Sequence, residues 1–224
     1  MTLPAILFVV LLVSGLLMVA LHFAYASPNT DAIKLYPNKS KRLSWGQLLT
    51  NVAVNALLTG GMAVGITLGF RDALISEAPA TWTTIGLQAL ATLLLYDLLY
   101  YFMHRFLFHE WKLMRSVHVV HHTNKFPTAL ESLYGHPLEN FLGVGLMLTC
   151  TAIVGPVSLP AFAVIFATFS WLNLLIHSGL DFRWPGLRVF GFMARKHARH
   201  HASMRAGNYA SITPLPDLLF RTHE

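Results

Sequence analysis

The chain has 224 residues, of which 54% are hydrophobic and only 12% are charged, and its formal net charge is +6. Soluble globular domains carry about 25% charged residues, so this composition excludes an ordinary soluble protein and predicts a single-domain integral membrane protein. The basic residues flank apolar segments and form no single patch, which indicates contact with lipid head groups and not with nucleic acid. The single cysteine, Cys150, excludes a disulfide framework and a cysteine-ligated metal or iron–sulfur site.

The first apolar segment, Leu3 to Ala26, is long enough to span a bilayer. Ala24-Tyr25-Ala26 has the form of a signal-peptidase site, but a secretory signal normally carries a basic start and a shorter apolar core. No Lys or Arg precedes Lys34, so we expect the segment to remain as a span. His22 is expected to be an interfacial or structural residue, because it is remote in sequence from the other histidines.

A polar loop from Ser27 to Gly46 follows, and its basic residues are Lys34, Lys39, Lys41 and Arg42. The positive-inside rule places this loop in the cytoplasm. The next span, from about Gln47 to Phe70, carries a stripe of small residues at Gly61, Gly65 and Gly69. Such a stripe lets another helix approach closely, in the same chain or in a second copy, so a homo-oligomer is one expectation.

The third predicted span, Trp82 to Met103, returns to the cytoplasmic side and places Asp97, Tyr101 and His104 on one helix face. A carboxylate within a span suggests a functional site. We expect Asp97 to accept a ring N–H from a metal-binding histidine and so to orient it, with Tyr101 beside it. The alternative is a solvated interfacial aspartate.

His104 and His109 lie five residues apart, which is about 140° around an ideal helix. To share one site they need a bulge, a helix end or two different metals. The polar stretch from Glu110 to Pro127 is expected to form a helix on the cytoplasmic surface. His136 precedes Pro137 at the start of the next apolar stretch, so it is either a helix cap or a ligand.

Two shorter apolar runs, Asn140 to Ile153 and Ala161 to Ile176, predict a hairpin that enters and leaves the membrane from the cytoplasmic side. His177 at the end of the second run is expected to be a further metal ligand, and Asn173 could hold a metal-bound water. The tail, from Phe182 to Glu224, is expected to rest on anionic lipid.

The predicted fold is therefore an all-α membrane helix bundle of about three full spans plus a membrane hairpin, capped by a cytoplasmic histidine-rich metal site. It forms one membrane domain over residues 1–224, with N-terminal spans in residues 1–80 and a histidine-box catalytic region in residues 81–224.

Twelve histidines occur in the chain, and eight of them lie in three short boxes. Two boxes have the pattern His-x2-His-His, at residues 118–122 and 197–201. Histidines at i, i+3 and i+4 project from one helix face, so each box is expected to present three imidazoles in one direction. Imidazole suits iron, zinc, copper and nickel, and two such faces supply ligands for two metal ions. Unrelated surface or core histidines are the plainer alternative.

The order His-x4-His, His-x2-His-His, His-x2-His-His resembles the fatty acid hydroxylase/sterol desaturase superfamily. The resemblance runs from about Asp97 to Phe220 and includes three accompanying motifs, Asp97-x3-Tyr101-x2-His104-Arg105, His136-Pro137-x-Glu139 and Asn208-Tyr209. It implies an integral membrane di-iron oxygenase that uses O₂ and external electrons to hydroxylate or desaturate a lipid. The implied catalytic metal ligands are His104, His109, His118, His121, His122, His197, His200 and His201, with His177 as a further histidine.

Asn173 stands where some members of that superfamily carry a histidine, which puts one ligand of one metal in doubt. The resemblance implies two iron ions, for which zinc could substitute on purification. The chain has no flavin or nicotinamide fingerprint and no cysteines for an iron–sulfur cluster, so a separate ferredoxin, cytochrome or reductase is expected to supply electrons. The alternatives are a lipid desaturase with the same site, a membrane protein that binds zinc or another metal without redox activity, and a membrane haem protein.

Overall fold

The computed structural model describes residues 2–36 and 43–224, and the chain there is almost entirely helical. This confirms the predicted all-α membrane fold. Of the basic loop residues used to predict topology, Lys39, Lys41 and Arg42 lie outside the described residues. The main helices are α1 (Leu3–Ala26), α2 (Trp45–Gly69), α3 (Arg71–Leu74), α4 (Trp82–Phe102), α5 (Lys112–His118), α6 (Pro137–Val154), α7 (Leu159–Ile176), α8 (Arg188–Ala202) and α9 (Leu215–Leu219). Short segments complete the list: a π-helical turn, η2 (Met103–Glu110), the 3₁₀ turns η1 (Pro28–Ile33), η3 (His121–Thr123), η4 (Ala129–Leu133) and η5 (Pro185–Leu187), and the strands β1 (Ile75–Ser76) and β2 (Val157–Ser158).

Five helices of the described chain are long and apolar enough to cross a membrane: α1, α2, α4 with η2, α6 and α7. The expected hairpin is present as α6 and α7, and each arm has 18 residues. An 18-residue helix is about 27 Å long, close to the thickness of a bilayer's hydrocarbon core. Both arms therefore count as candidate spans, and the chain is a multi-pass membrane protein.

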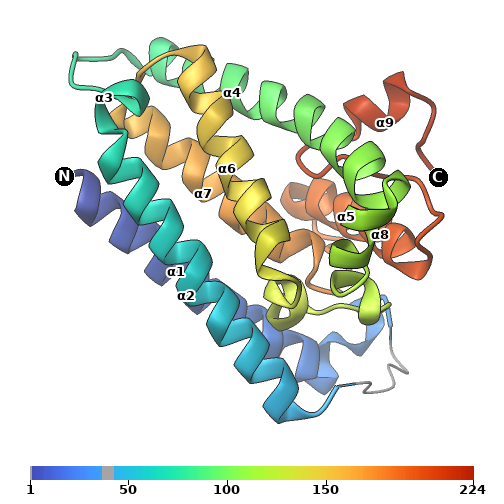
Figure 1. Ribbon diagram of the computed structural model, residues 1–224. Coiled ribbons are helices and arrows are strands. Elements are labelled where there is room, and N and C mark those ends of the chain that lie inside the picture. The colour runs from blue at the N-terminus through green and yellow to red at the C-terminus, as the bar shows by residue number, and fades with distance from the viewer. Residues whose placement is uncertain (1, 37–42) are drawn as a thin grey trace.

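The helices alternate in direction, so the bundle has two distinct ends (Figure 1). At one end the loop after α3 meets the turn between α6 and α7, where β1 pairs in parallel with β2. Helices α1, α4 and α7 run toward the opposite end, and α5, α8 and α9 gather there (Figure 1). All three histidine boxes lie at this second end.

The N-terminal helix packs as an integral part of the bundle. Leu7 of α1 is buried in the main core with Met147, Phe162 and Ile165 of the α6–α7 hairpin. At the other end of α1, the Tyr25 hydroxyl donates a hydrogen bond to the Tyr36 carbonyl (2.6 Å). Burial in a well-packed core is the main stabilising contribution that an apolar helix can make.

The Gly61, Gly65 and Gly69 stripe is exposed on α2. A Cβ atom built at any of these glycines would meet no atom within 4 Å, so no helix of the described chain packs against the stripe. An oligomer through these glycines stays a prediction.

The predicted surface helix over Glu110 to Pro127 is wrong in extent. Helix α5 has only seven residues and ends at His118, after which the chain makes a turn and then η3. This early end matters for the second histidine box, as described below.

Candidate metal centre

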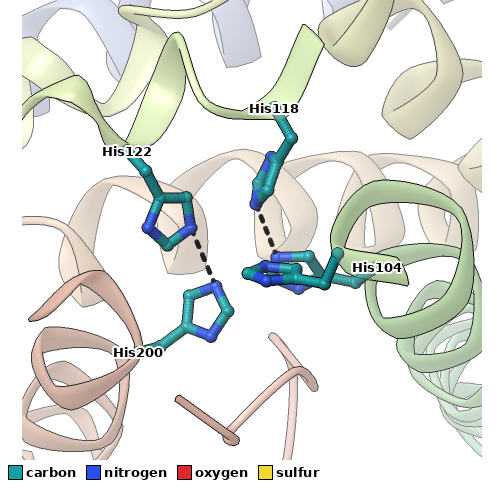
Figure 2. A group of neighbouring side chains, drawn as sticks. His104, His118, His122 and His200 are labelled. Carbon is teal, nitrogen blue, oxygen red and sulfur yellow. Dashed lines mark hydrogen bonds between the residues drawn. The ribbon is translucent and has the colours of Figure 1, made fainter. Parts of the chain in front are cut away.

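Nine histidines converge at one end of the bundle in two adjacent groups. Within each group, the candidate ligand nitrogens all lie within 4.8 Å of one another. The first group consists of His104, His109, His118, His122 and His200, four of which are labelled in Figure 2. The second group consists of His121, His177, His197 and His201. Every histidine predicted as a metal ligand lies in one of the groups, whereas His22 and His136 lie outside both.

The π-helical turn η2 brings His104 and His109 into the same group. In a π-helix each hydrogen bond spans five residues, and the Trp111 amide accordingly donates to the Phe106 carbonyl (3.0 Å). Residues five apart therefore stack on one side, and the His104 and His109 ring centroids are 5.0 Å apart. The sequence predicted that these two residues need a bulge, a helix end or two different metals to share a site. The structure shows the first of these, a bulge in the form of the π-helical turn.

The second box divides between the groups, because α5 ends at its first histidine. His118 is the last residue of α5, and His121 and His122 belong to η3. Nε2 of His118 lies 3.1 Å from Nε2 of His104 in the first group, whereas Nε2 of His121 lies 3.1 Å from Nε2 of His177 in the second. The prediction that this box presents three imidazoles from one helix face is wrong.

The third box lies on the continuous helix α8 and also serves both groups. His197 and His201, one turn apart, have their Nε2 atoms 3.1 Å apart in the second group. Nε2 of His200 lies 3.1 Å from Nε2 of His122 in the first (Figure 2). The second and third boxes therefore each contribute to both candidate sites, whereas the first box contributes His104 and His109 to the first group alone.

The outward nitrogens of three histidines in the first group donate hydrogen bonds to the chain that follows α8. His104 Nδ1 donates to the carbonyl of Tyr209 (2.7 Å), His109 Nδ1 to that of Met204 (2.9 Å), and His200 Nδ1 to that of Gly207 (2.8 Å). We call residues 203–224 the C-terminal collar. Such bonds fix both the tautomer and the direction of a metal-binding imidazole.

In the second group the corresponding carbonyls come from the helical bundle. His121 Nδ1 donates to the Tyr134 carbonyl (3.0 Å), and His177 Nδ1 donates to the Asn173 carbonyl in the last turn of α7 (2.7 Å). Asn173 thus contacts this group through its backbone, and its side chain lines the adjoining cavity. Any residue at position 173 would offer the same carbonyl.

These bonds leave the inward nitrogens without protons. A carbonyl only accepts hydrogen bonds, so an imidazole bonded to one through Nδ1 carries its proton there and presents a lone pair at Nε2. His121 and His177 both meet this condition, yet their Nε2 atoms face each other at 3.1 Å. Two lone pairs cannot hydrogen-bond to each other, and a cation between them removes the conflict. The donor set therefore fits metal ions.

The electrostatics also keep these imidazoles neutral. Burial lowers the pKa of His118 and of His177 to about 3. Burial, followed by the neighbouring histidines, holds the pKa of His200 and of His201 well below its usual value. Neutral imidazole is the form that binds a metal.

A carboxylate and a helix cap lie beside the histidines. Oε1 of Glu139, in the first turn of α6, lies 3.0 Å from His118 Nδ1. The sequence assigned no separate role to Glu139, although the motif His136-Pro137-x-Glu139 contains it. Nδ1 of His136 accepts a hydrogen bond from the Leu138 amide (3.2 Å). His136 is therefore the N-cap of α6, one of its two predicted roles.

The prediction that Asp97 accepts a ring N–H from His104 is wrong. Both carboxylate oxygens of Asp97 instead accept bonds from the collar: the amides of Ser211 (3.1 Å), Ile212 (2.8 Å) and Thr213 (2.9 Å) and the Thr213 hydroxyl (2.7 Å). Asp97 fixes the chain two residues beyond Tyr209, whose carbonyl accepts from His104. Its effect on that ring is indirect.

Tyr101 likewise contacts the collar and not the site. Its hydroxyl accepts hydrogen bonds from Arg105 (2.8 Å) and Thr222 (3.2 Å), and its ring stacks on Phe220 with centroids 5.0 Å apart. The sequence predicted that Tyr101 lies beside a metal-binding histidine. The structure instead places it against the collar.

A buried ion pair, which the sequence did not reveal, also holds the collar. Asp217 is completely buried and accepts hydrogen bonds from the amides of Tyr209 (2.8 Å) and Ala210 (3.0 Å). Lys196, one residue before the third box, lies 2.7 Å from Asp217 and also donates to the Ala210 carbonyl. The collar carbonyls are thus fixed by two carboxylates and one ammonium group.

Comparison with known proteins gives a family match and several relatives. Residues 89–222 match the family described as Fatty acid hydroxylase. The chain is 34% identical over 152 residues to a very-long-chain aldehyde decarbonylase of Oryza sativa subsp. indica, covering 63% of this chain and 54% of that protein. It is 32% identical over 153 residues to methylsterol monooxygenase 1 of Rattus norvegicus, covering 65% and 50%. It is also 31% identical over 185 residues to methylsterol monooxygenase 2-2 of Arabidopsis thaliana, covering 78% and 66%.

These alignments span about half of the length of the first two relatives and two thirds of the third. No solved structure matches the chain.

Proposed function

The chain belongs to the fatty acid hydroxylase family, and from that premise we propose that it is a membrane-bound oxygenase that hydroxylates a C–H position of a lipid. The reaction uses O₂ and electrons from a separate donor. One observation carries the proposal: imidazoles with their protons held outward by carbonyls direct unprotonated Nε2 atoms at one another in two groups. The relatives named methylsterol monooxygenase and very-long-chain aldehyde decarbonylase support a lipid substrate.

We propose one iron ion for each group, held by the inward nitrogens of the nine histidines. Iron bound there supplies the oxidising power that an unactivated C–H bond requires and that no side chain provides. The chain's own residues hold the imidazoles neutral, aim them through carbonyls, and bury all of them except His121, which is half-buried. A cavity of about 100 Å³ reaches both groups and is lined by His104 and His118 of the first and His121, His177 and His197 of the second.

The position of the groups also separates this proposal from metal transport. A transporter is expected to place ionisable ligands near the middle of its spans, whereas these histidines lie at one end of the bundle (Figure 1). We propose that this end faces the cytoplasm, where a ferredoxin, cytochrome or reductase delivers electrons. The arginines of α8, Arg188, Arg195 and Arg199, lie at this end and agree with the positive-inside rule.

The test combines metal analysis with lipid analysis. Purified protein is expected to hold about two metal ions per chain, and cells that make it are expected to contain a lipid that has gained one oxygen atom. Loss of two hydrogen atoms would instead identify a desaturase with the same site. Protein that binds no metal when prepared with iron would contradict the proposal, and so would full metal occupancy with no lipid change under aerobic conditions with reductant.

A further inference from the structure

Two asparagines of the span α2 contact the loop that orients the second histidine group. Asn51 and Asn55 lie one helical turn apart, and Asn55 is completely buried. An amide side chain within a span costs free energy unless its hydrogen bonds are satisfied. Both asparagines hydrogen-bond to Gly135, which follows Tyr134, the residue whose carbonyl accepts from His121. Polar groups of α2 therefore reach a candidate metal ligand through one short loop.

Asn51 bonds to Gly135 on both sides. Its side-chain oxygen accepts from the Gly135 amide (3.1 Å), and its side-chain nitrogen donates to the Gly135 carbonyl (3.1 Å), to which Asn55 also donates (3.0 Å). The Gly135 N–H and the Tyr134 carbonyl belong to one peptide unit, and a peptide unit is planar. Fixing the direction of this N–H therefore fixes the carbonyl to which His121 Nδ1 donates (3.0 Å).

The clamped peptide lies directly against the imidazole that it orients. A Cβ atom built on Gly135 would lie 3.8 Å from the Cβ atom of His121. Hydrogen bonds in a buried chain polarise one another, so bonding the N–H also strengthens the carbonyl of the same peptide as an acceptor. Because His121 Nε2 lies 3.1 Å from His177 Nε2, a rotation of this peptide would change the geometry between two candidate ligands.

The same amide network extends to the cavity at the histidines. The side-chain oxygen of Asn55 accepts from the side-chain nitrogen of Asn140 on α6 (2.9 Å). Asn140 lines that cavity, and so does Thr59, one turn beyond Asn55 on α2. Helix α2 thus supplies part of the cavity wall as well as the clamp on the loop. Its residues precede residues 89–222, so they lie outside the part of the chain that matches the family.

We propose that Asn51 and Asn55 are positioning residues for His121, and that α2 thereby determines how tightly the second histidine group binds its metal ion. This proposal rests on the proposed function in one respect, the binding of a metal ion by the second group. It adds a contribution from an N-terminal span that the histidine boxes do not reveal.

The experiment measures metal affinity in purified full-length protein loaded with cobalt(II), whose visible absorption depends on ligand geometry. Asn51→Ala removes both side-chain bonds to Gly135 and should leave α2 intact, since alanine is the best helix former. A chelator is expected to remove one ion at about tenfold lower concentration than from the wild type, because a lost outer partner has an effect of about 10–100-fold. The absorption of that ion is expected to change, and the other ion is expected to keep its affinity. Asn55→Ala, which leaves the Asn51 bonds in place, is expected to weaken the same ion by a smaller factor.

Combined variants assign the weakened ion to a group. His200→Ala removes a ligand of the first group, and adding Asn51→Ala to it is expected to weaken the remaining ion by the same factor. His201→Ala removes a ligand of the second group, and there Asn51→Ala is expected to change the affinity of the remaining ion by less than about twofold, as for independent sites. Equal losses in both backgrounds would overturn the proposal, because they would reflect general destabilisation.

Val52→Ala is the matched control, because Val52 adjoins Asn51 on α2 and is buried, but its side chain forms no hydrogen bond. It is expected to lower thermal stability and to leave both metal affinities unchanged. Asn51→Asp is the conservative variant: a neutral carboxyl group has one acceptor and one donor, as the amide does, so affinity is expected to stay within about threefold of wild type. Wild-type affinity in both Asn51→Ala and Asn55→Ala would overturn this inference and leave the proposed function standing. Wild-type protein that binds no metal would refute the proposed function and, with it, this role.

Discussion

The two histidine groups differ in what orients them. The first group is oriented by carbonyls of the C-terminal collar, at Met204, Gly207 and Tyr209. The second is oriented by the carbonyls of Asn173, within helix α7, and Tyr134, just after η4. Helical backbone is fixed by its own hydrogen bonds, whereas the collar depends on side chains from elsewhere. One candidate metal site therefore belongs to the bundle, and the other depends on a segment bound to it.

The largest effects are expected from removing a ligand in either group. His200→Ala and His201→Ala should each lower metal content from about two ions per chain to about one, because imidazole is lost from a different site in each case. Turnover should be abolished in both. Elemental analysis and lipid product assays check this, with His136→Ala as the control outside the groups. Loss of both ions in each variant would show that the sites are not separable.

Breaking the buried ion pair should affect the first group selectively. Asp217→Asn leaves the buried Lys196 ammonium uncompensated, which costs about 3–5 kcal/mol in the free energy of unfolding. The collar should loosen, and metal should be lost from the first group while the second keeps its ion. The measurement is thermal unfolding together with metal stoichiometry. Glu110→Gln, which alters the exposed pair of Arg105 and Glu110, is the control and should change stability by less than about 1 kcal/mol.

A smaller effect is expected from Asp97→Asn. The amide keeps one accepting oxygen but places a donor against the collar amides that the carboxylate now binds. Loss of such an outer partner typically weakens metal binding or activity by about 10–100-fold, and here the first group should weaken. Metal competition with a chelator measures the change, and Asp72→Asn at the opposite end of the bundle is the control. Wild-type affinity in Asp97→Asn would mean that the collar holds its place without this carboxylate.

The smallest effect is expected from Asn173→Ala. The bond to His177 Nδ1 comes from the backbone carbonyl, which alanine retains, so metal content of the second group should stay within about twofold of wild type. Helix α7 should also tolerate the change, since alanine is the best helix former. A strong loss of metal from the second group would instead support the role that the sequence suggested, an amide that holds a metal-bound water.

The sequence predicted the membrane bundle and the nine converging histidines because both depend on local patterns. Apolar length identifies spans, the repeated His-x2-His-His boxes indicate metal sites, and the resemblance to the superfamily supplied the full set of histidines. It did not predict the division of His118 and His121 between groups, because this follows from where α5 ends. Nor could it identify the carbonyls of Met204, Gly207 and Tyr209, since a backbone acceptor carries no side-chain signature. Asp97 was misassigned because its partners, residues 211–213, are close only in the folded chain.

The π-helical turn η2 also explains why chain length matters between His104 and His109. A π-turn is equivalent to one extra residue inserted into an α-helix, here accommodated within η2 without breaking the helix that leads into it. Removing one of the four intervening residues, such as Leu107, would leave a His-x3-His spacing, which an ordinary α-helix already places on one face. An α-helical segment of that length would keep His109 on the face that carries His104, and α5 and the second box, which follow His109, would keep their orientation relative to α4. A single-codon deletion within η2 is therefore expected to disturb the site less than one within α4, where the loss of a residue rotates everything downstream by about 100°.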